Sequence, residues 1–175
     1  MTKGYLLDTN IVSYLICGLN QDGSANGINV LKHYQEHEKN ASMFICAATT
    51  GEVEYGLKVA PSPSVTMQQE VRNVLDAFPA VMALDKHVAA DHYAALRAKI
   101  FKKYASKNQK DRAKTRYIEE WCDPSTGKSL GINENDVWIV AVALAHNLTL
   151  ITADKMDHIK AIVPAGFSVF NWTNP

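Results

Sequence analysis

The sequence predicts an α/β protein with a central parallel sheet flanked by helices. Short apolar segments alternate along the chain with longer segments of helical periodicity, a pattern typical of βαβ units. One predicted helix, residues 136–146, is apolar nearly all round and is therefore expected to be central and buried. At 175 residues, the chain is most simply one domain, residues 1–175, and is long enough to build a sizeable core.

Five apolar segments are the predicted strands. The first runs directly into a polar Asp-Thr-Asn sequence. The third is the weakest prediction, because it is short and contains methionine and alanine. Strands that are separated by helices favour parallel pairing with both faces of the sheet covered. The predicted strands are residues 4–7, 43–46, 81–84, 148–151 and 167–170.

The predicted helices fill the intervals between the strands. Asp8 or Thr9 is expected to cap the first helix, and Asn133 or Asn135 the helix that begins at residue 136. Residues 105–131 give no clear pattern, apart from a turn at 123–127. The predicted helices are residues 9–17, 28–38, 50–59, 65–75, 86–104, 136–146 and 154–162.

Composition and charge exclude several classes of protein. No apolar run approaches the ~20 residues of a membrane helix, and the N-terminal residues lack a signal-peptide pattern, so a cytoplasmic protein without a membrane partner is expected. The three cysteines have no metal-like spacing. The net charge is zero, yet nine of the 18 lysines and arginines fall between Arg97 and Arg116, with Asp111 as the only acid there.

Two acids in the first half of the chain are candidate site residues. Asp8 follows the first strand directly, although its side chain could also serve as a helix N-cap. Glu52 is preferred to Glu54, because small or apolar residues, including Tyr55 and Val59, stand three, four and seven positions after Glu52. The alternative for Glu52 is a favourable charge in a first helical turn.

Two more candidates lie in the second half. Asp136 is the strongest signal, because the residues three, four and seven positions later are Ile139, Val140 and Ala143. A carboxylate on a buried apolar stripe is costly unless it is paired or bound to a metal, although a first-turn charge remains an alternative. Asp154 follows the fourth strand and could instead cap the next helix.

These four acids are expected to converge at one edge of the sheet. Asp8 and Asp154 come just after strand ends, while Glu52 and Asp136 stand near the starts of helices that follow the same edge. Four carboxylates held close together would repel one another and partly protonate. A divalent cation removes that conflict, and all-oxygen ligands favour Mg²⁺ or Mn²⁺ over zinc.

An ordered set of short motifs resembles the PIN domain, and within it the VapC-type toxins of bacterial toxin–antitoxin pairs. The resemblance implies a central parallel five-stranded sheet, a metal-dependent ribonuclease that acts on RNA, an antitoxin protein as partner and a homodimer. The family's acidic residues correspond to Asp8, Glu52, Asp136 and Asp154, with Asn10 as the polar residue beside the first acid and Thr9 as a further supporting residue. The motifs are residues 6–12, 52–57, 93–98, 135–141 and 150–154.

The expected chemistry is hydrolysis of an RNA phosphodiester bond by a metal-activated water. A bound Mg²⁺ or Mn²⁺ lowers the pKa of a coordinated water and offsets charge on the phosphate. Asp8 and Asp136 are the first choices as ligands. Asp154 is expected to ligate a second ion or hold a water, and Glu52 to orient the attacking water.

The chain departs from the family in the segment 100–130. This segment is much longer than the short link that usually joins the two helices in the family, and it is interpreted as a basic insertion. Tyr104 and Tyr117 are candidates for stacking on unpaired bases. A solvated helix and a surface for an acidic partner are the alternatives. The candidate RNA-binding residues are Lys102, Lys103, Lys107, Lys110, Arg112, Lys114 and Arg116.

Two other functions remain open on the sequence. A phosphotransferase would use Asp8 as its nucleophile, but enzymes resembling the haloacid dehalogenase family need a second acid where Asn10 stands. A PIN-like module that binds RNA or protein without catalysis is the other alternative. The P-loop-like sequence at 125–129 is rejected as a nucleotide site, because Cys122 stands where the required glycine would be.

Overall fold

The computed structural model describes residues 3–62, 64–105 and 117–175. Its centre is one sheet in which all neighbouring strands run parallel, in the order β3-β2-β1-β4-β5. This confirms the predicted parallel five-stranded sheet, although β3 and β5 are shorter than expected. The strands are β1 (Lys3–Leu7), β2 (Ala41–Cys46), β3 (Val81–Met82), β4 (Thr149–Ile151) and β5 (Val169–Phe170).

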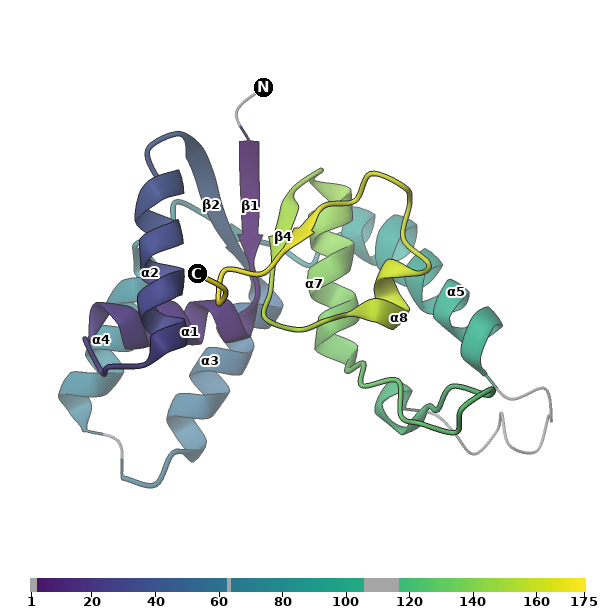
Figure 1. Cartoon of the computed structure of the whole chain (residues 1–175), viewed down its shortest axis with the longest axis horizontal. Helices are drawn as coiled ribbons and strands as arrows, with labels where there is room; N and C mark the ends of the chain where they lie inside the picture. Colours follow the sequence, from purple (N-terminus) through teal and green to yellow (C-terminus); the bar gives the residue numbers. More distant parts are fainter. Residues whose placement is uncertain (1–2, 63, 106–116) are drawn as a thin grey trace.

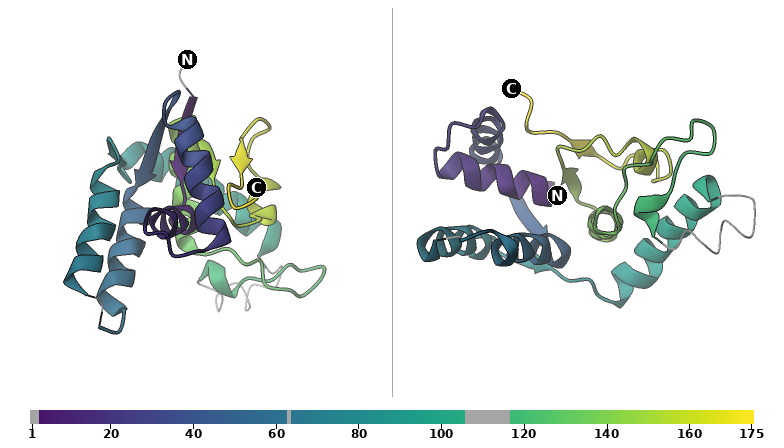
Figure 2. Two further views of the ribbon diagram at one scale, coloured as in Figure 1. Left: turned by 60° about the vertical axis from the view of Figure 1, so that its left-hand side comes forward. Right: turned by 90° about the horizontal axis from the view of Figure 1, so that it is seen from below.

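The helices lie in two groups on either side of β1 (Figure 1). The first group, α1 to α4, comes from the first half of the chain, and α5, α7 and α8 come from the second half; a view from below shows the same division (Figure 2). The helices are α1 (Thr9–Leu19), α2 (Ala25–His37), α3 (Ala47–Val59), α4 (Val65–Asp76), α5 (Ala94–Tyr104), α7 (Glu134–Ala145) and α8 (Asp157–Lys160), with the short helices η1 (Val88–Tyr93) and η2 (Ile118–Glu120).

The alternation of side chains along β1 explains why both faces are covered. Leu6 points into a core made with α7 and α5, whereas its neighbours Tyr5 and Leu7 point into a second core made with α1 and α2. Successive residues of a strand face opposite sides of the sheet. Leu6 and Leu7 are both fully buried, and each such burial stabilises the fold by about 1.5–3 kcal/mol.

The predicted single helix over residues 86–104 is present without interruption, but its middle is a π-helix that the sequence did not predict. The chain forms a π-helix, η1, before α5, and the Ala94 N–H reaches back to the Ala89 carbonyl. The wider turn accompanies a face-to-face stack of Tyr93 on Trp138 of α7, with ring centroids 3.7 Å apart. The Tyr93 hydroxyl also donates to the Glu134 carboxylate. Contacts with α7, which local periodicity does not report, therefore accompany this π-helical segment.

The helix predicted over residues 154–162 begins later and is shorter. Met156 is the N-cap of α8 and has a left-handed backbone with φ of 49°. The Asp154 N–H donates to the Thr152 hydroxyl at 3.0 Å, so this residue belongs to the turn after β4. The alternative role of Asp154 as a helix cap is thereby excluded.

The strand order creates a switch point between β1 and β4. From β1 the chain first proceeds outward through β2 and β3, and it later returns to β4 on the other side. The Asp8 N–H donates to the Ile151 carbonyl at 2.9 Å, which ties the two strand ends together. Open α/β sheets bind ligands outside the carboxyl ends of strands at such points. Among the described residues, no helix combines the length and apolarity that crossing a membrane requires.

Candidate carboxylate site

Asp8 is both the N-cap of α1 and a buried member of the candidate site. Its Oδ1 accepts the Thr9 N–H at 2.7 Å, and its side chain begins the helix from an extended backbone. Its Oδ2 accepts from the Thr152 hydroxyl at 2.6 Å and from Asn10 Nδ2 at 3.1 Å. Asp8 is only 3% exposed, so its confirmed role as the helix N-cap does not keep its carboxylate from lying buried among the other candidate acids.

Asn10 and Thr152 join Asp8 to Asp154. Asn10 Nδ2 donates to Asp154 Oδ2 at 2.9 Å, and Asn10 Oδ1 accepts the Ala153 N–H at 3.0 Å. The buried Thr152 hydroxyl donates to Asp8 and accepts the Asp154 N–H. Sequence reasoning missed Thr152; its position between a strand end and an acid was the available signal.

Glu52 enters the same network from α3. Its Oε2 accepts from the Thr9 hydroxyl, and its Oε1 accepts from Asn135 Nδ2 at 2.6 Å. Asn135 is a second residue that sequence reasoning missed, since it was considered only as a helix cap. The carboxylate of Glu52 is therefore held by neutral donors from α1 and α7.

The preference for Glu52 over Glu54 agrees with the structure, but the argument for it does not. Glu54 instead pairs with Arg72 of α4, with an N–O distance of 2.8 Å. Tyr55 and Val59, the apolar residues taken to mark the inward face, are 66% and 58% exposed. Glu52 reaches the site because it lies in the second turn of α3, close to the strand end, and not because an apolar face carries it inward.

Asp136 lies at the start of α7, where it forms a capping box with Asn133. Its Oδ2 accepts the Asn133 N–H at 2.8 Å, and its own N–H donates to Asn133 Oδ1 at 2.8 Å. The cap is thus Asn133 and not Asn135. Asp136 is nevertheless buried, so capping and membership of the carboxylate site coexist here as they do at Asp8.

The pKa values show that the four acids interact. Burial raises the pKa of Asp8 to about 6, and the charges of Asp154 and Glu52 add to this, while hydrogen bonds from Thr152 and Thr9 oppose it. The pKa of Asp136 is raised to about 7 by burial and by the charges of Asp8, Asp154 and Glu52, while the hydrogen bond from the Asn133 N–H opposes the rise. Like charges that are held near one another disfavour ionisation in this way.

The four carboxylates are chemically suited to bind a hard divalent cation, although their side chains are not close enough together to form a ready-made metal site. Within the described residues, no three His, Cys, Asp or Glu side chains form a group able to hold a metal ion; hydroxyl and amide donors lie between the carboxylates instead. All the candidate ligand atoms are carboxylate oxygens, and two of the four carboxylates, those of Asp8 and Asp136, are buried. Mg²⁺ and Mn²⁺ prefer such oxygen ligands.

Most of the predicted RNA-binding residues lie outside the described part of the chain: Lys107, Lys110, Arg112, Lys114 and Arg116. Lys102 and Lys103 are exposed at the end of α5. The stacking role predicted for Tyr104 is wrong, because this residue is buried and its hydroxyl lies 3.5 Å from the His158 carbonyl. Tyr117 is exposed, so its predicted role remains open.

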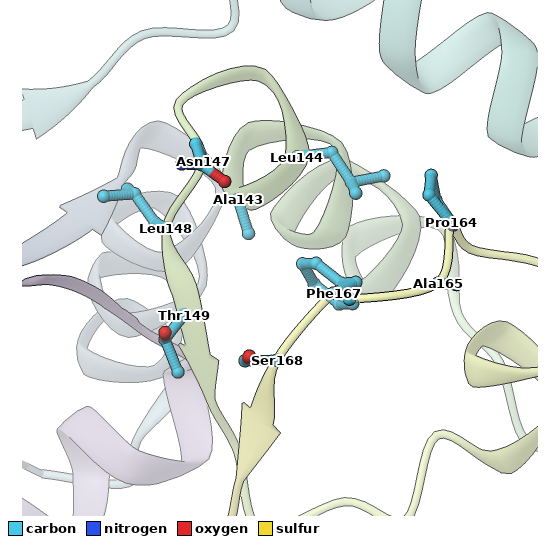
Figure 3. A pocket seen from close by; sticks show the side chains of 10 residues that line it. Ala143, Leu144, Asn147, Leu148, Thr149, Pro164, Ala165, Phe167 and Ser168 are labelled. Atoms are coloured by element: carbon cyan, nitrogen blue, oxygen red, sulfur yellow. The ribbon is translucent and has the colours of Figure 1, made fainter.

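Two cavities flank α7 at opposite ends. One of about 330 Å³ lies between the C-terminal end of α7, the start of β4 and residues 164–168 (Figure 3). It contains none of the four acids. A smaller cavity, of about 270 Å³, includes Asp136 and Asp154 in its lining. The smaller cavity is therefore the one that belongs to the carboxylate site.

The comparisons agree with this geometry. The family model of the PIN domain matches residues 5–161. The chain belongs to the PIN domain family. This PIN domain has the parallel sheet and flanking helices that the resemblance implied. A comparison with curated proteins finds no significant match.

Solved structures share the fold of this PIN domain. VapBC2 from Rickettsia felis bound to a DNA fragment from their promoter contains a chain with a TM-score of 0.66 and 21% identity, over 97% of this chain and 98% of that chain. FitAB bound to the IR36 DNA fragment contains one with a TM-score of 0.61 and 19% identity, over 98% and 96%. FitAcB from Neisseria gonorrhoeae gives 0.58 and 20%, over 98% and 99%.

Proposed function

We propose that this PIN domain is a metal-dependent endoribonuclease, the toxin of a toxin–antitoxin pair. The observation that carries the proposal is the network at the switch point, where Asp8, Glu52, Asp136 and Asp154 come from four separate segments and the charges of neighbouring acids help to raise the pKa of Asp8 and of Asp136. A structural role alone gives no reason to place so many acids together, since close carboxylates repel. A reaction that needs a cation beside a phosphate does give one.

Each acid has a role that its contacts support. Asp8 and Asp136 would hold Mg²⁺ or Mn²⁺, with Asp154 as a further ligand or a holder of water. The cation would supply hydroxide near neutral pH and offset charge on the scissile phosphate. Glu52, fixed by Thr9 and Asn135, would orient the attacking water. Asn10 and Thr152 would hold Asp8 and Asp154 at a fixed separation.

The proposed partners follow from the family resemblance and from the solved relatives. The neighbours VapBC2 and FitAB are described as complexes bound to DNA. For this chain we propose an antitoxin protein as partner, RNA as substrate, a homodimer and a cytoplasmic location. The basic residues between 102 and 116, within the proposed insertion at 100–130, would attract the RNA backbone.

RNA cleavage by the purified protein tests this proposal. We expect cleavage with Mn²⁺ or Mg²⁺, none with EDTA, and a loss of at least about a hundredfold in Asp8→Asn and Asp136→Asn. Asp76→Asn is the matched control, because Asp76 is exposed at the end of α4. This variant should cleave RNA at the wild-type rate. Cleavage that survives EDTA or either site variant contradicts the mechanism.

The same assay separates the two alternatives. Tight RNA binding without cleavage by the wild type would indicate a binding module. Hydrolysis of small phosphate monoesters, with phosphate trapped on Asp8, would indicate a phosphotransferase. Both carboxylate oxygens of Asp8 accept hydrogen bonds in the structure, which makes this side chain better suited to holding a position than to attacking phosphorus.

A further inference from the structure

The cavity beside Asp136 and Asp154 has features that the proposed chemistry does not use. It has a volume of about 270 Å³ and is lined by residues 130–132 and 154–159 together with Asp136; we call it the α8 pocket. Drug-sized ligands occupy cavities of about 300–1,000 Å³, so the α8 pocket suits a smaller, compact group. Figure 1 shows α8 next to the lower half of α7, where the pocket lies.

The walls of the α8 pocket are apolar. Leu130, Ile132 and Ile159 are buried, and Met156 is half-buried. These side chains come from two segments far apart in the sequence, and all four line the same cavity. Apolar walls favour an occupant with an uncharged face, such as a flat aromatic ring.

The rim of the α8 pocket is polar and mostly acidic. Asp136, Asp154 and Asp157 contribute carboxylates, against which Lys155 contributes one ammonium group. An excess of negative charge disfavours a phosphate inside the pocket. It favours a neutral group that carries N–H donors, because a carboxylate accepts such bonds strongly.

His158 is held in place at the same rim. Its Nδ1 lies 3.2 Å from the Tyr104 hydroxyl, and the two rings meet edge to face with centroids 5.2 Å apart. This anchors the imidazole to α5, so that its orientation is set before any ligand arrives. The α8 pocket therefore combines apolar walls with a polar rim on which the His158 side chain already has a fixed orientation.

We propose that the α8 pocket binds an unpaired RNA base next to the scissile phosphate, and that Asp157 selects bases that carry an exocyclic amino group. Unpaired bases are recognised by packing on their faces and by hydrogen bonds to their edges, and an Asp carboxylate accepts from the amino group of cytosine. The carboxylates shared by the pocket and the site place such a base beside the reacting phosphate. The proposal rests on RNA being the substrate and adds a determinant of which RNA is chosen.

An arginine side chain from a protein partner is the competing occupant. Its guanidinium would also find carboxylates, and its stem would find apolar walls. Charge alone would favour the guanidinium, because three carboxylates face the single Lys155 ammonium. The position of the pocket favours the RNA base, because its lining shares Asp136 and Asp154 with the proposed catalytic site, where the RNA substrate must lie.

Nucleoside binding to the wild-type protein tests the proposal without any need for catalysis. Cytidine and uridine form a matched pair that differs at the amino group, and adenosine and inosine form another. Methyl resonances of Met156 and Ile132 report on the pocket, and Met67, exposed on α4, is the control. We expect cytidine to shift the pocket methyls and not Met67, and to bind about tenfold more tightly than uridine, since the uridine edge faces the Asp157 carboxylate with an acceptor.

The variant Asp157→Asn should remove this preference, because an amide presents both donors and acceptors. Equal binding of cytidine and uridine to the wild type, shifts at Met67 equal to those at Met156, or an unchanged preference in the variant would overturn the proposal. L-argininamide that shifts Met156 at lower concentrations than cytidine would overturn it in favour of a protein partner.

The two proposals fail separately. If nucleosides bind the α8 pocket but the protein cleaves no RNA, the base-binding proposal stands and the ribonuclease proposal is contradicted. If the protein cleaves RNA with a metal but nucleosides do not shift the methyl resonances of Met156 or Ile132, the ribonuclease proposal stands and the base-binding proposal is contradicted.

Discussion

At the scale of single residues, Asp8 and Asp136 each do two things. Asp8 caps α1, Asp136 completes the capping box of α7, and each lies buried beside other acids that raise its pKa. The carboxylate that begins the helix is thereby fixed in position for the site. An N-cap and a site residue are alternatives in sequence reasoning, but the backbone N–H groups at a helix start occupy only part of a carboxylate's capacity for hydrogen bonds.

The raised pKa values predict how stability depends on pH in the absence of metal. The pKa of Asp8 is about 6 and that of Asp136 about 7 when folded, against 3.8 as the reference value for both. Between these values the folded state binds more protons than the unfolded state, so the free energy of unfolding falls as pH rises from about 4 to about 7. The loss at Asp8 is on the order of 3 kcal/mol.

Urea unfolding in EDTA across this pH range measures the effect. Asp136→Asn should flatten the fall above pH 5 and should be more stable than the wild type at pH 8, since the amide keeps the capping acceptor without a buried charge. A wild type whose stability rises from pH 4 to pH 7 would contradict the electrostatic account.

Thr152 is predicted to be a positioning residue for Asp8. In Thr152→Val the shape is nearly kept, but Asp8 loses a 2.6 Å hydrogen bond and the Asp154 N–H loses its acceptor. We expect a loss of about 1–3 kcal/mol in the free energy of unfolding, and a cleavage pH profile displaced to higher pH, since the lost bond favoured ionised Asp8. Thr149→Val is the matched control, because Thr149 is a buried threonine at the start of β4, three residues before Thr152. An equal displacement there would refute the specific role.

At the scale of elements, the structure follows the sequence where short-range patterns decide the outcome. The order of strands and helices came from periodicity. Capping preferences reduced the two helix starts to Asp8 or Thr9 and to Asn133 or Asn135, and the structure has Asp8 and Asn133. The π-helix η1, the late start of α8, and the bonds of Asn135 and Thr152 depend on residues far away in the chain: Thr152 reaches Asp8 across 144 positions. No local pattern encodes such contacts, which is why the four acids, Thr9 and Asn10 could be nominated from the sequence while the roles of Thr152 and Asn135 could not.

Glycines in α1 and α3 give a matched prediction for helix packing. A Cβ added at Gly18 would lie 2.4 Å from the Gly27 carbonyl oxygen on α2, whereas one added at Gly56 in α3 meets nothing within 4 Å. Gly18→Ala should therefore push α2 away from α1 and lower the free energy of unfolding by about 1–3 kcal/mol. Gly56→Ala should raise it by about 0.5–1 kcal/mol, because alanine is the better helix former.

Thermal unfolding of the two variants checks this pair. A Gly18→Ala protein as stable as the wild type would mean that α1 and α2 do not approach each other as closely as described. A Gly56→Ala protein less stable than the wild type would mean that the exposed face of α3 makes contacts absent from the described residues.

At the scale of the whole molecule, the strand order decides where the site lies. The order β3-β2-β1-β4-β5 puts β1 in the middle and separates α1 to α4 from α5 to α8. The four acids then come from both halves of the chain, with Asp8 and Glu52 from the first and Asp136 and Asp154 from the second. A carboxylate site at this point requires the complete fold, so its function and the stability of the sheet are linked.

The central claim is that these four carboxylates together make a cation site. Calorimetric measurement of Mn²⁺ binding tests this claim most directly. The account predicts that the wild type binds Mn²⁺ at pH 7.5 and more weakly below pH 6, where protons compete for Asp8 and Asp136. It predicts that Asp136→Asn binds at least about tenfold more weakly, while Asp76→Asn binds as the wild type does. Equal Mn²⁺ affinity in the wild type and Asp136→Asn would contradict it.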